Sequence, residues 1–288
     1  MDTKALNMLT NASKIASGCG VTNDISINHT MIPNIKLSAE LTRAELLDYI
    51  MIFLCERINI EYSYFKGGYV LTKLLPEEAR STQDIDFSIS EISQYEDIKI
   101  VLKDLGETLL NAGIINKYEI KPVITKESTG GIKMTPIDRT SNIKIDIGWH
   151  DLSWGVQSWN CLGFNCKRFE VERMLADKIS TIYSLKRFRR IKDIYDVYIL
   201  TNNFDVDFKK LADYISKRNT IDWNENPFDI IVLTEYGKAY NTLNIKSTKG
   251  FNINKPAFSV VVERLKCLMS KYGQNVIWNH MTKEFKEI

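Results

Sequence analysis

Two short segments alternate strictly between apolar and polar side chains, and this alternation limits the possible folds more than any other feature. In the segment 84–89, one face carries Asp84 and Asp86 and the other carries isoleucine and phenylalanine. In the segment 143–148, one face is isoleucine throughout and the other carries Asp146. A period of two is that of a β-strand with one buried face. The sequence therefore predicts two strands whose acidic side chains lie opposite the core.

Helical patterns surround these strands. Thr42-Arg-Ala-Glu45 has the form of a capping box, which predicts a helix beginning near residue 42. Residues 98–113 predict a helix between the two strands, with a glycine at its end. Helical spacing then predominates after residue 171, and the predicted helices cover 171–186, 191–201, 207–218 and 257–272.

These patterns divide the chain into three parts. We expect a mixed α/β (α+β) core over residues 41–165 and a mainly helical C-terminal domain over residues 166–288. The first forty residues, 1–40, are polar and irregular, and we expect them to form an N-terminal arm or a lid.

Composition and charge narrow the class of protein. With 44% hydrophobic and 26% charged residues, the chain is globular rather than disordered or fibrous. A net charge of +2 gives no overall field that would draw it to nucleic acid or an anionic membrane. The longest apolar run, Tyr49–Cys55, is far shorter than the roughly 20 residues of a membrane span. Without a signal-peptide pattern, and with five scattered cysteines, we expect a cytoplasmic protein that binds no membrane.

The paired carboxylates are the first candidate site. Asp84 and Asp86 lie two residues apart, so their side chains share a face with about 7 Å between Cβ atoms. Such a pair can be the solvated face of a strand or a site for a hard cation such as Mg²⁺. If the two predicted strands are neighbours, Asp146 joins the same face. Three carboxylates then suit metal-dependent phosphate chemistry, with Mg²⁺ or Mn²⁺ held by all three.

A glycine pair supplies a candidate phosphate site. Lys66, Gly67 and Gly68 precede an apolar helical pattern, and two glycines there let the backbone approach a ligand closely. The N–H groups at a helix N-terminus are ready donors to phosphate. A lone glycine pair is more often a turn, but this one lies 16 residues before Asp84. Arg80, Ser81 and Thr82 fall between them and can add phosphate contacts.

A lysine interrupts an apolar helical stripe. Lys178 follows Met174 and Leu175 in the row that should face the core of the helix 171–186. A lysine in a core is costly unless it is paired or used, although its stem can also extend to water. Asp193 and Asp196, one turn apart on the next predicted helix, are candidate partners of its ammonium. Ordinary solvated helix charge is the alternative for either carboxylate.

A basic run follows that helix. Five positive charges fall within seven positions, which is usually a solvated face. Against a nearly neutral chain it is also the best local candidate for binding RNA or a triphosphate. Its members are Lys186, Arg187, Arg189, Arg190 and Lys192. Trp149, Trp154, Trp159 and Trp223 can stack on bases or pack in the interior.

Four motifs occur in order over about residues 62–200: Phe65-Lys-Gly-Gly68, Arg80-Ser-Thr-Gln-Asp-Ile-Asp-Phe87, Glu172-Arg-Met-Leu-Ala-Asp-Lys178 and Lys192-Asp-Ile-Tyr-Asp196. Together with Ile145-Asp146-Ile147, they resemble the nucleotidyltransferase superfamily with the polymerase-β-like core. Within it, the sequence is most similar to the AbiEii/AbiGii-type toxin nucleotidyltransferases. The resemblance implies a mixed sheet and transfer of a nucleoside monophosphate from an NTP, with pyrophosphate leaving.

The resemblance also implies roles for particular residues. Catalytic roles fall on Asp84, Asp86, Asp146 and Lys178, and a divalent cation falls on the three aspartates. Nucleotide binding is implied for Lys66, Gly67, Gly68, Arg80, Thr82, Lys178, Asp193 and Asp196. Since relatives of this type are toxin halves of toxin–antitoxin or abortive-infection systems, an RNA acceptor such as tRNA and an antitoxin partner are expected.

Two other functions remain open from the sequence. A small-molecule nucleotidyltransferase of the aminoglycoside-modifying kind would use the same core. A degenerate relative would bind nucleotide or RNA without turnover. The presence of Asp84, Asp86 and Asp146 argues against the second, because a pure binding protein does not need the third carboxylate.

Overall fold

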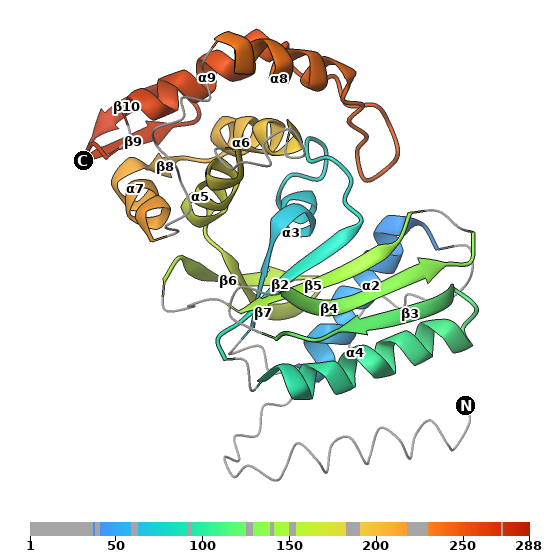
Figure 1. Ribbon diagram of the computed structural model, residues 1–288. Coiled ribbons are helices and arrows are strands. Elements are labelled where there is room, and N and C mark those ends of the chain that lie inside the picture. Colours follow the sequence, from blue (N-terminus) through green and yellow to red (C-terminus); the bar gives the residue numbers. More distant parts are fainter. Residues whose placement is uncertain are drawn as a thin grey trace. The chain divides into compact units, whose positions relative to one another are not determined.

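The computed structural model describes residues 37, 41–58, 63–91, 94–124, 129–138, 141–149, 154–182, 191–217, 230–271 and 273–288. All of these belong to one compact unit, residues 34–288, and the following description concerns that unit (Figure 1). The predicted arm or lid, residues 1–40, lies outside the described residues except for Leu37.

A seven-stranded mixed sheet forms the centre of this unit, in the order β3-β4-β5-β2-β1-β7-β6. The two strands predicted from alternation, β2 and β5, are neighbours and pair in parallel, and β1 pairs with β2 in the antiparallel sense. The mixed sheet is therefore confirmed. Its strands are β1 Ser63–Lys66, β2 Asp84–Ile89, β3 Ile115–Lys121, β4 Thr129–Pro136, β5 Ile143–Trp149, β6 Val156–Cys161 and β7 Phe164–Phe169.

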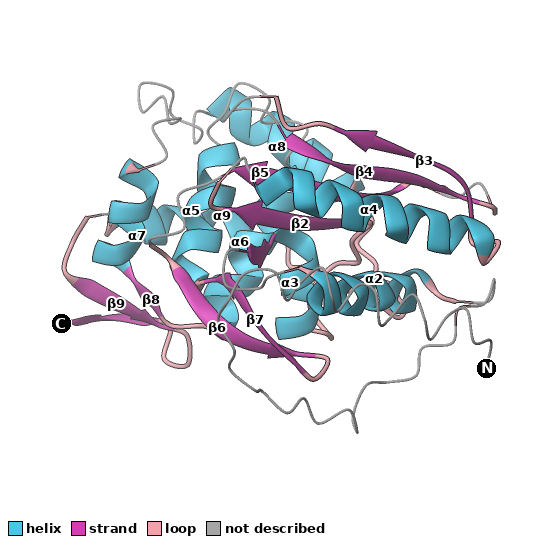
Figure 2. Ribbon diagram, turned by 90° about the horizontal axis from the view of Figure 1, so that it is seen from below, coloured by secondary structure: helices cyan, strands magenta, loops and turns pink. Residues whose placement is uncertain are grey.

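Three helices accompany the sheet: α2 Arg43–Arg57, α3 Gly67–Leu74 and α4 Gln94–Asn111. The predicted capping box is present, because the Thr42 hydroxyl accepts from the Glu45 N–H while the Glu45 carboxylate accepts from the Thr42 N–H. Helix α4 begins one turn before the prediction, since its acidic first turn suits a helix N-terminus but carries no apolar spacing. It packs along β3 and β4 (Figures 1 and 2).

The C-terminal part is mainly helical, as predicted, and also contains a small sheet of order β10-β9-β8. That sheet was not predicted, because its strands of two to four residues give too little alternation to detect. Helix α8 was not predicted either. The elements are α5 Val171–Ile182, α6 Ile191–Asn203, β8 Val206–Asp207, α7 Phe208–Ser216, α8 Ile230–Thr242, α9 Phe258–Ser270, β9 Val276–Asn279 and β10 Glu284–Glu287. Strand β7 runs through the expected boundary at residue 165, and the division into domains stays a prediction.

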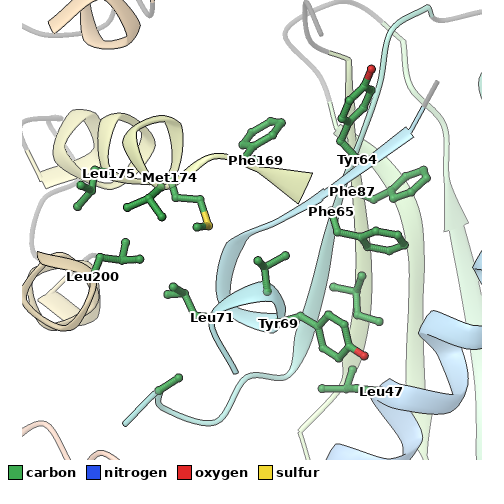
Figure 3. Packing of buried hydrophobic residues seen from close by; sticks show 14 of the residues in the cluster. Leu47, Tyr64, Phe65, Tyr69, Leu71, Phe87, Phe169, Met174, Leu175 and Leu200 are labelled. Carbon is green, nitrogen blue, oxygen red and sulfur yellow. The ribbon is translucent and has the colours of Figure 1, made fainter. Parts of the chain in front are cut away.

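One hydrophobic cluster joins the sheet to the C-terminal helices. Figure 3 shows Phe65 of β1 on one side of the view and Leu175 of α5 and Leu200 of α6 on the other, with Leu71 of α3 between them. The central strands of the sheet and the C-terminal helices are therefore packed through a shared core. Among the described residues, no helix combines the length and apolar character needed to cross a bilayer.

Candidate active site

The sheet register brings the predicted aspartates together. Asp86 of β2 lies directly opposite Asp146 of β5, and Asp84 lies two residues before Asp86 on the same face. All three are partly buried, whereas Ile85 and Ile145, on the opposite face, are almost fully buried. The sequence analysis predicted a shared face only if the two strands were neighbours. They are neighbours, and the three carboxylates lie on one face.

These carboxylates destabilise one another's charged forms. Burial raises the pKa of Asp86, the Lys66 ammonium opposes this, and the Asp146 and Asp84 charges add to it. Burial and the Asp84 charge likewise raise the pKa of Asp146. Like charges held this closely favour either a proton or a cation between them. The face therefore carries excess negative charge that a bound cation would relieve.

The residues fit a divalent cation that is shared with a substrate. No three His, Cys, Asp or Glu side chains in the described part of the chain are placed to hold a metal ion by themselves. Mg²⁺ needs no such set, because it commonly takes one or two carboxylates and fills its shell with water and phosphate oxygens. Asp84 and Asp86 offer those donors, and Gly67 leaves the room, since a Cβ there would collide with the Asp86 carboxylate.

Beside the aspartates, the glycine pair opens helix α3. Gly67 has a φ of +74°, and the Lys66 side chain at the N-cap makes no capping hydrogen bond to the first turn. A Cβ on Gly68 would lie 2.9 Å from the Thr82 hydroxyl. We refer to Gly67, Gly68 and Thr82 as the phosphate cradle. It presents uncapped backbone N–H groups and a hydroxyl next to Asp86, which is the donor set that a phosphate requires.

A buried ion network lies next to the cradle, formed by Arg80, Lys178, Asp193 and Asp196. The Lys178 Nζ donates to Asp193 Oδ1 at 3.1 Å and to Asp196 Oδ2 at 2.6 Å, which confirms the predicted pairing. Arg80 donates from Nε and Nη2 to the two Asp196 oxygens at 3.0 and 2.8 Å. Arg80 was predicted to contact phosphate, but two of its N–H groups are used in this bidentate pair.

The ionisation of the network follows from these contacts. Burial alone would raise the pKa of Asp196, but Lys178 and Arg80 outweigh it and hold that pKa below its usual range. Burial also tends to lower the pKa of Lys178, and the Asp196 and Asp193 carboxylates raise it overall. Both groups therefore stay charged, and Asp196 is 0% exposed between its two cations. Each buried charge has an opposite charge in contact with it.

Several contacts from the C-terminal part hold the loop between α3 and β2, residues 75–83, which we call the α3–β2 loop. The Tyr195 hydroxyl donates to the Glu78 carbonyl at 2.7 Å, and Asn203 Nδ2 donates to Glu78 Oε2 at 2.8 Å. The Ser81 N–H donates to the Lys246 carbonyl at 2.6 Å. These contacts were not predicted, since contacts between segments far apart along the chain leave no mark on the local sequence.

One cation near the site was also missed. Arg43, in the first turn of α2, donates to the Ser141 carbonyl at 2.8 Å. Burial lowers its pKa, while the Asp138 and Asp84 charges raise it, so Arg43 lies within the field of Asp84. In the sequence, Arg43 lies inside the capping box, and nothing in that motif indicates that it lies near Asp84.

Of the predicted RNA-binding run, only Lys192 is described, while Lys186, Arg187, Arg189 and Arg190 lie outside the described residues. Trp223 also lies outside them. Trp154 packs against Tyr214 with ring centroids 5.0 Å apart, and Trp159 packs against Phe65 at 6.4 Å. Packing thus accounts for these two tryptophans.

Comparison with solved structures finds similar folds at low identity. JHP933 from Helicobacter pylori is 15% identical, with 80% of this chain and 94% of that chain covered and a TM-score of 0.40. An antigenic nucleotidyltransferase-like protein from Paracoccidioides brasiliensis is 16% identical, with coverage of 73% and 96% and a TM-score of 0.37. The antibiotic-resistance factor ANT(2'')-Ia is 11% identical, with coverage of 61% and 90% and a TM-score of 0.40.

Comparison with curated proteins finds no match. The family model for the nucleotidyl transferase AbiEii toxin of type IV toxin–antitoxin systems matches residues 56–254, well over half of the chain. This range contains the three aspartates, the phosphate cradle and the ion network. The chain is therefore a nucleotidyltransferase and belongs to the AbiEii toxin family of type IV toxin–antitoxin systems.

Proposed function

We propose that the protein transfers a nucleoside monophosphate from a nucleoside triphosphate to an RNA acceptor, with tRNA as the first candidate. We further propose that it is the toxin of a pair whose antitoxin binds or counteracts it. The observation that carries the transfer reaction is the register that sets Asp86 opposite Asp146 beside the N-terminus of α3. Family membership and the basic run support the RNA acceptor and the antitoxin partner.

The triphosphate is proposed to bind through the phosphate cradle. The first N–H groups of α3 and the Thr82 hydroxyl donate to phosphate oxygens, and the positive end of the helix dipole favours their charge. Lys66, directly opposite Asp86 across β1 and β2, adds positive charge at the same edge. The substrate is thereby positioned with its α-phosphate toward the aspartates.

Asp84 and Asp86 would hold the divalent cation, with Asp146 sharing it or facing the acceptor. When bound, the cation neutralises phosphate charge and polarises the α-phosphate. An Asp146 carboxylate oxygen accepts the proton of the acceptor hydroxyl. The acceptor oxygen then bonds to the α-phosphorus, the bond to the β-phosphate oxygen breaks, and pyrophosphate leaves.

The test is incubation with Mg²⁺ and each α-³²P-labelled triphosphate, in parallel with total RNA, purified tRNA and an aminoglycoside. The control is the double variant Asp84→Ala/Asp86→Ala. We expect label in RNA that is absent with the control, and weaker RNA binding at higher salt because counterions are released. Label in the aminoglycoside alone would instead identify a small-molecule enzyme, and triphosphate binding without any transfer would identify a degenerate relative.

A further inference from the structure

The face of the sheet that carries the three aspartates continues over the neighbouring strands β4 and β3. Asp146 of β5 lies directly opposite Gly131 of β4, and Gly131 in turn lies opposite Lys121 of β3. Because side chains two residues apart on a strand share a face, the register assigns further residues to this face. They are Lys144 of β5, Thr129, Lys133 and Thr135 of β4, and Lys117 and Glu119 of β3.

This part of the face is accessible to solvent. The charged residues that β3 contributes are exposed, and Lys133 and Lys144 are partly exposed. The opposite face of the same strands is covered by helix α4, whose Gly106 packs against the ring of Tyr118 (Figures 1 and 2). The strands therefore present one face to the core and a polar face to solvent.

Lysines predominate on the polar face. Apart from Asp146 itself, β3, β4 and β5 carry four lysines and one acidic residue, Glu119, on this face. None of the four ammonium groups forms an ion pair or a hydrogen bond with a residue that the structure describes. Their positive charge is therefore available to an anionic ligand. We call this set of side chains the lysine face: Lys117, Lys121, Lys133 and Lys144.

The stability of the sheet does not account for the lysine face. Lys133 and Lys144 lie directly opposite each other, and like charges in that position destabilise a sheet. Their other cross-strand neighbours, Glu119 and Asp84, form no ion pair with them. Lysines on an edge strand such as β3 can prevent aggregation, but β4 and β5 are inner strands and need no such protection. The opposed pair is suited to a phosphate lying between the two ammonium groups.

The lysine face leads to Asp146 without a side chain in between. Gly131 occupies the position beside Asp146 on β4, and only glycine fits there, because a Cβ would lie 1.8 Å from the Ile145 carbonyl oxygen. Burial and the Asp84 charge raise the pKa of Asp146, and the Lys144 and Lys121 charges oppose this rise. Both lysines therefore act electrostatically on the carboxylate that would face the acceptor.

We propose that the lysine face binds the phosphate backbone of the RNA acceptor and leads its reacting hydroxyl to Asp146. This inference rests on the proposed function and names the surface that holds its acceptor. Phosphates carry the charge that the unpaired lysines lack, and a positively charged surface that follows the backbone is typical of proteins that bind single strands. An aminoglycoside is a polycation that the same lysines would repel. The lysine face thus favours RNA over the small-molecule acceptor.

The test compares full-length variants that each lose two exposed lysines. Lys117→Gln/Lys121→Gln changes the lysine face, and Lys99→Gln/Lys103→Gln on α4 is the matched control with the same spacing. Fluorescence anisotropy with labelled tRNA, over a series of salt concentrations, measures binding. For the β3 variant, we expect the slope of log affinity against log salt to fall by about 1.5, at roughly 0.7–0.9 for each lost contact. Adding Lys133→Gln should lower the slope by a further step of similar size, and the control should equal wild type.

Kinetics and nucleotide binding separate the lysine face from the phosphate cradle. The KM for RNA should rise severalfold in the β3 variant, whereas kcat, triphosphate binding by isothermal titration and the unfolding midpoint should stay at wild-type values. An unchanged salt slope, or an equal loss in the α4 control, would overturn the lysine face, while labelling of RNA by the wild-type protein would leave the proposed function intact. Labelling of an aminoglycoside in place of RNA would overturn both.

Discussion

At the scale of single residues, Gly67 meets two requirements at once: a left-handed backbone with φ of +74°, and open space for the Asp86 carboxylate. Gly67→Ala should therefore cost stability by about 1–2 kcal/mol for the backbone and also displace Asp86. Gly113→Ala is the matched control, because Gly113 has a φ of +68° with nothing within 4 Å of the added Cβ. We expect similar destabilisation by thermal unfolding but loss of nucleotidyl transfer only with Gly67→Ala. Equal activity of the two variants would show that the space beside Asp86 is not required.

Asp146 shows the conflict between stability and activity. Because its pKa is raised in the folded protein, its charged form destabilises the fold at neutral pH. Asp146→Asn should abolish transfer and raise the free energy of unfolding and the unfolding midpoint at neutral pH.

The gain of Asp146→Asn over wild type should depend on pH. Below the raised pKa, wild-type Asp146 is itself protonated, so the difference in unfolding midpoint should shrink as the pH falls through it. Parallel melting curves of the two proteins across pH 4–8, without divalent cation, measure this. A difference in unfolding midpoint that does not change with pH would mean that the charge of Asp146 does not destabilise the folded protein.

At the scale of helices and loops, the ion network joins α5, α6 and the α3–β2 loop. Asp196→Asn removes the carboxylate that contacts both Arg80 and Lys178. Breaking a buried pair in this way should cost about 3–5 kcal/mol at pH 7. Asp205→Asn serves as control, since Asp205 forms an exposed pair with His280 and should change stability far less. Urea titration measures both losses.

The acid dependence of Asp196 follows from its lowered pKa. A carboxylate whose folded pKa is depressed stabilises the protein fully above its unfolded pKa of about 3.9, and this contribution is lost as the pH falls toward the folded pKa. The wild-type advantage over Asp196→Asn should thus be constant above about pH 5 and narrow below pH 4. An advantage that persists unchanged at pH 2.5 would contradict the assignment.

Local sequence patterns predicted the individual elements of the site better than the contacts that bring these elements together. Alternation predicted β2 and β5, and the misplaced lysine in an apolar row predicted the pairing of Lys178 with Asp193 and Asp196. The features that the sequence could not predict depend on contacts between segments far apart along the chain. Arg80 is bound to Asp196 rather than free for phosphate. In the α3–β2 loop, the Glu78 carbonyl accepts from Tyr195 and the Ser81 N–H donates to Lys246, and these loop groups are main-chain groups that every residue carries.

At the scale of the whole unit, the C-terminal elements complete the core that the active-site strands share. Val261 of α9 is 0% exposed, and the Trp278 Nε1 donates to the Thr201 carbonyl at 2.7 Å. Truncation after residue 243 should therefore expose the core and give a protein without cooperative unfolding or triphosphate binding. Trp278→Phe, which loses only the hydrogen bond, should cost about 1 kcal/mol. Soluble yield and near-UV circular dichroism test both, and a truncated chain that melts like wild type would contradict this account.

The support of the α3–β2 loop has a consequence for synthesis of the protein on the ribosome. The loop is anchored by Asp196, 116 positions after Arg80, and by the carbonyl of Lys246. A nascent chain that already displays its aspartates and glycines still lacks the partners that hold Arg80 and Ser81 in place. We therefore expect a growing chain to lack nucleotidyl transfer until the segment around residue 246 has left the exit tunnel.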